Sequence, residues 1–167
     1  VGLGGIHRDI FTMGARPIAA LHSFRFGGIE ARRTKEMVRG VAEGIGDYGN
    51  ALGIPTVGGE VYIHPSYENS IVVNTMSVGT VKASEAIFAR ATGAGNPIFI
   101  VGAETGRNRA AMVSERPADG ATSKIPTIQV GDPFLEKCLL EATMEALKVR
   151  AIVGMQDLGT AGIACAA

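Results

Sequence analysis

The sequence predicts a mixed fold of α-helices and β-strands, in the α/β or α+β class. Strand-like apolar runs occur at Pro17–Phe26, Thr56–Ile63 and Ile71–Val81, and each is bounded by turn-forming residues. Apolar residues recur at three- and four-residue steps over Thr34–Leu52 and again after Pro133, a spacing that places them on one helix face. A composition of 46% hydrophobic and 19% charged residues in 167 positions is typical of a chain with a buried core.

The first half of the chain is expected to alternate helix and strand. A short helix is predicted over Ile6–Met13, ending at Gly14, because glycine readily takes the left-handed conformation that closes a helix. Thr34 is the predicted N-cap of the long helix, and Gly53 marks its end. Glycines inside that helix indicate close packing against a sheet or a ligand, with simple tolerance as the alternative. These glycines are Gly40, Gly44, Gly46 and Gly49.

The strand patterns at Thr56–Ile63 and Ile71–Val81 are separated by a turn-rich segment at residues 64–69. A short connection of this kind between two strand patterns is typical of a β-hairpin. The two strands are therefore predicted to pair with each other.

A second unit is predicted to begin near Ala94, which divides the chain into residues 1–94 and 95–167. Its expected elements are a buried strand at Ile98–Val101, a long loop at Glu104–Thr127, a helix that Asp132 caps and Pro133 begins, and a buried strand at Ala151–Met155. The glycine-rich turn at residues 156–162 follows the last strand, where open α/β sheets place ligand groups.

Charge and composition argue against several classes of partner. Lys+Arg and Asp+Glu both total 16, so no net field favours nucleic acid or an anionic lipid surface, and no apolar run approaches the ~20 residues of a membrane span. Cys138 and Cys165 show no metal-binding spacing, which favours reduced thiols in the cytoplasm. Because the chain starts at Val1 and ends in an apolar run, we expect it to be part of a longer protein.

The residues best suited to chemistry lie near the two ends of the chain. Arg8 and Asp9 follow a glycine run, and they supply a cationic fork for a phosphate and a hard oxygen for a divalent cation. Asp157 lies in the glycine-rich turn, and with Asp9 it makes a pair of carboxylates able to hold Mg²⁺. The alternatives are a solvated Arg-Asp pair at a helix start and a helix N-cap at Asp157.

Three further polar residues are weaker candidates. Gln129 carries an amide that could read the hydrogen-bonding pattern of a ligand, a weak signal by itself. Glu60 is either catalytic or a strand acid with a local partner, and the second interpretation is favoured. His22 is interpreted as an ordinary strand histidine.

Several blocks of sequence, in the same order, resemble the phosphoribosylformylglycinamidine synthase family, whose ATP-dependent synthase subunit acts at the fourth step of purine biosynthesis. Ordered matches of this length are far more specific than a single glycine motif. The resemblance extends over nearly the whole chain, which corresponds to roughly a quarter of a complete family chain. The blocks are Gly4-Gly5-Ile6-x-Arg8-Asp9-Ile10, Met13-Gly14-Ala15-Arg16-Pro17-Ile18-Ala19, Gly46-Asp47-Tyr48-Gly49-Asn50, Pro55-Thr56-Val57-Gly58-Gly59-Glu60, Gln129-Val130-Gly131-Asp132-Pro133-Phe134 and Gln156-Asp157-Leu158-Gly159.

The resemblance implies a fold and an activity. The fold is similar to aminoimidazole ribonucleotide synthetase: an N-terminal sheet-and-helix domain that pairs through its sheet with a similar domain, or with a second copy, followed by a larger α/β domain. The activity is a C–N ligase that converts formylglycinamide ribonucleotide, ATP and glutamine-derived ammonia to formylglycinamidine ribonucleotide, ADP and phosphate. By position, Arg8 and Gln129 would contact the nucleotide substrate, and Asp9 and Asp157 would hold Mg²⁺. The implied partners are glutaminase and small accessory subunits.

Two departures from the family pattern restrict what can be carried over. The family's catalytic histidine belongs to a Glu-Ser-His-Asn-His-Pro motif that precedes the position of Val1, so no catalytic residue is assigned here and the isolated chain is expected to be inactive. The histidines His7, His22 and His64 are not taken as substitutes. After Arg107 the chain lacks the family's Asp-Gly-Ile segment. The alternative functions are another ATP-dependent enzyme of the same fold, such as aminoimidazole ribonucleotide synthetase or a small-molecule kinase, and a non-catalytic dimerisation module.

Overall fold

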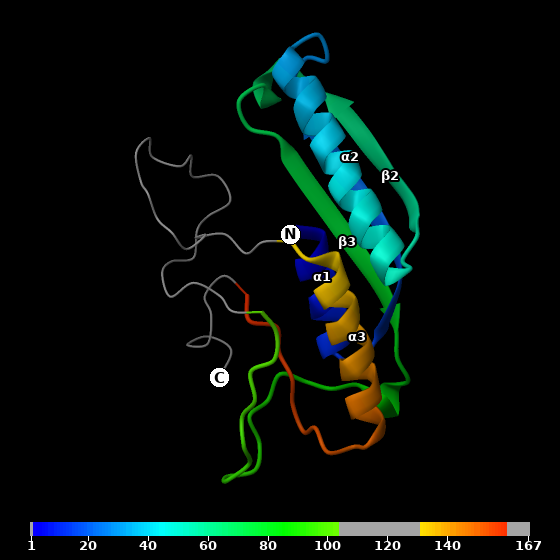
Figure 1. The fold of residues 1–167 in the computed structure, drawn as a ribbon, viewed down its shortest axis with the longest axis vertical. Helices are drawn as coiled ribbons and strands as arrows, with labels where there is room; N and C mark the ends of the chain where they lie inside the picture. The colour runs from blue at the N-terminus through cyan, green and yellow to red at the C-terminus, as the bar shows by residue number, and fades with distance from the viewer. Residues whose placement is uncertain (1, 104–130, 160–167) are drawn as a thin grey trace.

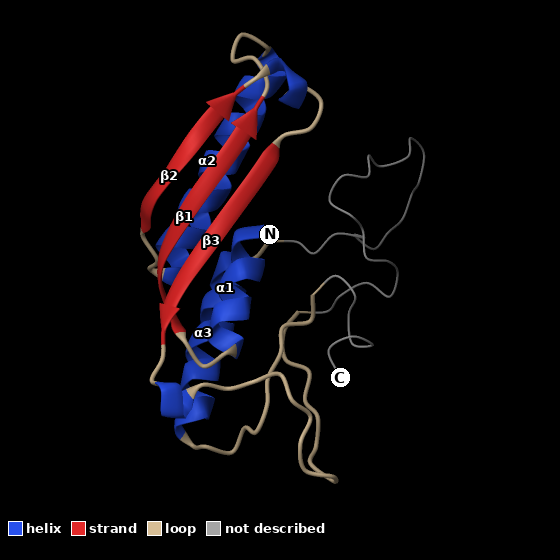
Figure 2. Ribbon diagram, turned by 180° about the vertical axis from the view of Figure 1, so that it is seen from behind, coloured by secondary structure: helices blue, strands red, loops and turns tan. Residues whose placement is uncertain are grey.

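The described part of the chain has the predicted mixed architecture, a β-sheet with α-helices packed on it. The computed structural model describes residues 2–103 and 131–159. Figure 1 and Figure 2 show the helices on one side of the sheet, while the other side is left open. In chain order the elements are α1 Gly2–Thr12, β1 Arg16–Phe26, α2 Arg32–Leu52, β2 Thr56–Ile63, η1 Pro65–Tyr67, β3 Val72–Thr80, η2 Ala83–Glu85 and α3 Pro133–Lys148.

The glycine run at the start of the chain is helical. Helix α1 begins at Gly2 rather than at the expected Ile6. A Cβ atom at Gly4 would lie 2.7 Å from the Cε1 atom of Tyr48 in α2, so a glycine is needed there for two helices to approach closely. The helix closes at Gly14, which has a φ of 81° as predicted.

Helix α2 starts without a side-chain cap. Ala31 occupies the N-cap position and makes no capping hydrogen bond, so the cap predicted at Thr34 is wrong. The helix already begins at Arg32, and Thr34 is a buried residue of its first turn.

The predicted close packing against the sheet does not occur at Gly40, Gly44 or Gly46, because no described atom lies within 4 Å of a Cβ built at these positions; at Gly49 such an atom would lie 3.2 Å from the Ile54 carbonyl oxygen. Simple tolerance of glycine in the helix is the interpretation that fits Gly40, Gly44 and Gly46.

The predicted hairpin is wrong, because β1 lies between the other two strands. The order is β2-β1-β3, with β1 parallel to β2 and antiparallel to β3. Helix α2 carries the chain back across the sheet, as a parallel pair requires. The connection from β2 to β3 then passes over the end of β1, where a Cβ atom at Gly27 would lie 2.6 Å from the Cα atom of Glu68. Glycine at position 27 makes this passage possible.

Helix α3 shares the hydrophobic core of the first half of the chain. Its start is as predicted, because the Asp132 Oδ1 atom accepts a hydrogen bond from the Leu135 backbone N–H at 2.9 Å. Leu140 is 1% exposed. A shared core does not by itself place a domain boundary, so the division of the chain at residue 94 stays a prediction. The buried apolar cluster consists of Leu3, Phe11, Ala20, Tyr48, Leu52, Ile54 and Leu140.

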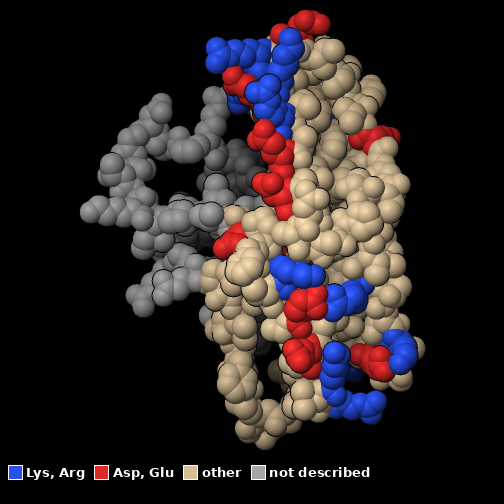
Figure 3. Space-filling model, turned by 45° about the vertical axis from the view of Figure 1, so that its right-hand side comes forward, with Lys and Arg blue, Asp and Glu red and all other residues tan. Residues whose placement is uncertain are grey.

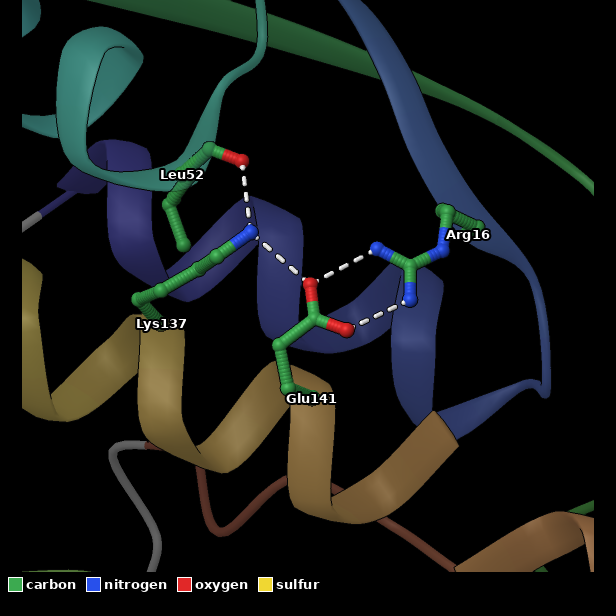
Figure 4. A network of polar contacts seen from close by, with 4 residues as sticks. All are labelled: Arg16, Leu52, Lys137 and Glu141. Carbon is green, nitrogen blue, oxygen red and sulfur yellow. Dashed lines mark hydrogen bonds and ion pairs between the residues drawn. The ribbon is translucent and has the colours of Figure 1, made fainter. Parts of the chain in front are cut away.

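A polar network also joins α3 to the start of β1 and the end of α2 (Figure 4). The Glu141 carboxylate accepts hydrogen bonds from two Arg16 nitrogens, at 2.9 and 2.7 Å, and from Lys137 Nζ at 2.8 Å. Lys137 also donates to the Leu52 carbonyl at 3.3 Å. The hydrogen bonds from Arg16 and Lys137 lower the pKa of Glu141 to about 2.

The two short strands expected in the second unit do not form. Neither Ile98–Val101 nor Ala151–Met155 is a strand, and the side chains of Ile98–Val101 are largely exposed. Among the described residues no strand pairs with either segment, and an apolar run forms a strand only where a neighbour completes its backbone hydrogen bonds. The predicted loop at Glu104–Thr127 lies outside the described residues, as do Gln129 and Cys165.

The open side of the sheet exposes apolar side chains. Ser77 bonds to His7 of α1 and therefore faces the helices, so Met76 and Val78 face the opposite way because side chains alternate along a strand. Met76 is 53% exposed. In the view of Figure 3, acidic and basic side chains follow one another in a band, and the surface beside the band is largely uncharged.

Candidate functional site

The side chain of Arg8, in α1, bonds to two acids that lie far away in the sequence. Its Nε atom donates to Asp157 Oδ1 at 2.9 Å, and its Nη1 atom donates to Glu136 Oε2 at 3.0 Å. The three side chains are largely shielded from water, where ion pairs are screened less than at a surface. This cluster brings together α1, the first turn of α3 and the segment that follows α3.

Two acids at this site, Asp9 and Glu136, have pKa values above their ordinary ones. Burial, and after it the nearby charge of Asp157, raises the pKa of Asp9 above its ordinary value. Burial also raises the pKa of Glu136, although Arg8 opposes the shift. Both shifts mean that the ionised carboxylates are held at a cost in free energy. A bound cation would favour the ionised form of each carboxylate.

Asp9 and Asp157, the two residues predicted to hold magnesium, interact electrostatically in the fold. The effect of Asp157 on the pKa of Asp9 is the result expected for two carboxylates that the fold brings together. No set of three or more His, Cys, Asp or Glu side chains is placed to hold a metal within residues 2–103 and 131–159. Mg²⁺ commonly takes only one or two protein carboxylates and completes its shell with water and phosphate oxygens.

Two weaker sequence candidates have local partners in the sheet. Glu60 accepts hydrogen bonds from Arg25 at 2.7 Å and from Ser23 at 2.9 Å, which confirms that it is a strand acid with a local partner. His22 lies in β1, and its ring nitrogens pair with the hydroxyl groups of Thr75 and Thr56.

Sequence analysis missed Glu136. An acidic residue in the first turn of a helix has an ordinary explanation, because it complements the helix dipole. The informative signal was its position four residues before Leu140, which places it on the core-facing stripe of α3. Glu136 is 4% exposed, and its Oε1 atom has no hydrogen-bond partner in the described part of the chain.

His7, the neighbour of Arg8 in α1, bonds to the sheet. Its Nδ1 atom pairs with Ser77 Oγ at 2.7 Å, and its Nε2 atom is buried without a partner among the described residues. Burial, with a smaller contribution from His22, lowers the pKa of His7 to about 4. The imidazole is therefore neutral at pH 7, and His7 packs α1 on β3.

No helix among the described residues has both the length and the apolar character needed to cross a membrane.

Residues 1–81 match the family described as AIR synthase related protein, N-terminal domain.

The chain is similar over nearly its whole length to phosphoribosylformylglycinamidine synthase subunits. The phosphoribosylformylglycinamidine synthase subunit PurL of Chlorobaculum tepidum is 53% identical over 165 residues, which cover 97% of this chain and 22% of the relative. The corresponding subunit of Methylocella silvestris is 50% identical over 99% of this chain and 23% of its own length. The chain thus spans about a fifth of the length of these relatives.

Solved structures agree with the sequence comparison. Thermotoga maritima PurL complexed with FGAR has a TM-score of 0.79 and 39% identity, over 97% of this chain and 26% of that one. The same protein complexed with ATP has a TM-score of 0.77 and 39% identity, over 99% of this chain and 24% of that one. By sequence and fold together, the chain belongs to the phosphoribosylformylglycinamidine synthase family, and its residues 1–81 match the AIR synthase related N-terminal domain.

Proposed function

We propose that this chain contributes the substrate- and metal-binding end of α1 to a phosphoribosylformylglycinamidine synthase. The reaction converts formylglycinamide ribonucleotide, ATP and glutamine-derived ammonia to formylglycinamidine ribonucleotide, ADP and phosphate. The observation that carries the proposal is the cluster in which Arg8 meets Asp157 beside Asp9. FGAR, the abbreviation of formylglycinamide ribonucleotide, and ATP are the ligands named for the Thermotoga maritima structures.

Each residue has a role that follows from its chemistry. Arg8 binds the phosphate of the ribonucleotide, because a guanidinium presents several donors in a fixed fork. Asp9 and Asp157 hold Mg²⁺, which when bound neutralises phosphate charge on the nucleotide. Gln129 completes the contacts to the ribonucleotide.

The remaining parts of the proposal concern the assembly. The catalytic histidine is supplied by sequence that precedes the position of Val1 in the family, so the 167-residue chain alone is inactive. The open side of the sheet pairs with a similar domain or a second copy. Glutaminase and small accessory subunits deliver ammonia, and the complex works in the cytoplasm. Steady turnover by the purified chain alone would contradict the proposal that the catalytic histidine comes from outside this chain.

The role of Arg8 is tested by binding in a complete synthase subunit that carries this sequence. Arg8→Gln should weaken formylglycinamide ribonucleotide binding by about 10- to 100-fold, since hydrogen bonds to charged groups contribute ~1.5–3 kcal/mol, and calorimetry without ATP measures this directly. Arg16→Gln is the matched control, because Arg16 also pairs with an acid of α3. Equal affinity in the two variants would reject the phosphate-binding role.

A further inference from the structure

The orientation of Arg8 depends on two carboxylates that bind different nitrogens of its side chain. Asp157 binds Nε and Glu136 binds Nη1. The function proposed above assigns Asp157 to Mg²⁺ and Arg8 to a phosphate, and both roles require the bond between these two residues to loosen. Glu136 is the contact that can remain when Asp157 turns to the metal.

Glu136 is built into a rigid part of the molecule. It lies on α3 one turn before Leu140, a residue of the buried apolar cluster, and a site held by a packed helix is positioned more accurately than one on a loop. The N-terminal end of a helix also favours a negative charge. Glu136 is therefore a fixed anionic support for the Arg8 side chain.

The carboxylate of Glu136 is not explained by packing alone. Its Oε1 atom is buried without a hydrogen-bond partner among the described residues, an arrangement that is unfavourable for a charged oxygen. An apolar side chain of similar volume would pack α3 against α1 without that penalty. The carboxylate contributes through its hydrogen bond to Arg8.

We propose that Glu136 is a positioning residue that holds the Arg8 guanidinium ready for the phosphate of the ribonucleotide substrate. The proposal rests on the function proposed for Arg8. Glu136 itself does not touch the substrate. Its removal should weaken substrate binding through the loss of a fixed Arg8, while the contacts of Mg²⁺-ATP remain.

The test compares two isosteric variants of α3 in a complete synthase subunit that carries this sequence. Glu136→Gln keeps the shape and removes the charge; Glu141→Gln makes the same change at the acid that pairs with Arg16 (Figure 4). We expect Glu136→Gln to weaken formylglycinamide ribonucleotide binding, measured by calorimetry without ATP, by about tenfold, because charge-assisted hydrogen bonds are roughly twice as strong as neutral ones. In turnover, KM for this substrate should rise while KM for ATP and kcat stay within about twofold. Glu141→Gln should leave binding unchanged.

A double-mutant cycle with Arg8→Gln separates the possible failures. If Glu136 acts through Arg8, adding Glu136→Gln to Arg8→Gln weakens binding no further. Full affinity in Glu136→Gln together with weak binding in Arg8→Gln would overturn the positioning role and leave the proposed function intact. Full affinity in Arg8→Gln would overturn both.

Thermal unfolding measured in parallel identifies a variant that does not fold. Glu136→Asp then replaces Glu136→Gln, because it keeps the charge but withdraws the carboxylate from Arg8 by one methylene. A raised KM for the ribonucleotide with an unchanged KM for ATP supports the proposal, and an unchanged KM for both overturns it.

Discussion

At the residue scale, buried histidines make the stability of this protein depend on pH. His7 is 1% exposed and His22 is 5% exposed, and burial lowers the pKa of each. The folded protein therefore holds His7 neutral down to a pKa of about 4, while the unfolded chain binds a proton near the ordinary value of 6.5. Between these two pH values the unfolded state binds more protons, so stability falls as pH falls.

We predict that the free energy of unfolding is lower at pH 5 than at pH 7.5, by about 2 kcal/mol from His7 alone. Urea unfolding in metal-free buffer at the two pH values measures the difference. His7→Gln, which has no proton to gain, should show a smaller pH dependence. If the free energy of unfolding changes equally between the two pH values in the variant and in the unmodified chain, His7 does not control the effect.

Two glycine substitutions should change stability in opposite directions. Gly4→Ala places a Cβ atom 2.7 Å from the Tyr48 ring and should destabilise the fold by ~1–3 kcal/mol through overpacking. Gly44→Ala adds a methyl group to an exposed helix position with no described atom within 4 Å, and should stabilise it by about 0.5–1 kcal/mol. Denaturant midpoints of the two variants give the comparison, and the same sign for both would contradict it.

At the element scale, α3 contributes to the same buried core as α1 and α2. Leu140 belongs to the same buried apolar cluster as Leu3 of α1 and Tyr48 of α2. Leu140→Ala should therefore destabilise α1, α2 and α3 together, by ~2–5 kcal/mol. Phe134→Ala is the control, because Phe134 is on the same helix but is 76% exposed, and its effect should stay within about 0.5 kcal/mol.

Hydrogen exchange checks the cooperativity of this loss. The amides of α1 and α2 should lose protection in Leu140→Ala to the same extent as those of α3, because one core stabilises all three helices. If only α3 loses protection, residues 95–167 behave as a separate unit, as the sequence suggested.

At the scale of the whole molecule, the open side of the sheet is expected to mediate association. Apolar surface of this kind is commonly an interface. Met76 of β3 lies on this side and is paired with Leu21 of the central strand β1. Met76→Glu should shift the protein from dimers or larger species to monomer in light scattering, since a charge would be buried on pairing. Val149→Glu, at an exposed apolar position at the end of α3, should leave the association unchanged. A monomer without either substitution would contradict the pairing.

The sequence determined the elements whose signals are local. The long helix was predictable because its apolar residues repeat with the helical period and Gly53 ends it. The cap at Asp132 was predictable because capping requires only a side chain and an amide three residues later. The positions of β1, β2 and β3 were also predictable to within one or two residues, since alternation and flanking turn residues are read from the chain itself.

Tertiary structure alone decided which of these elements meet. Pairing β1 with both β2 and β3 depends on the α2 crossover and on the passage over Gly27, whereas the local turn signal favoured a hairpin. The sequence named Arg8, Asp9 and Asp157 by residue type and by family resemblance, but only the fold places Asp157 on the Nε atom of Arg8. Glu136 joins them because packing Leu140 into the core turns that face of α3 inward. Burial and long-range charge arise from packing, so no local pattern of residues contains them.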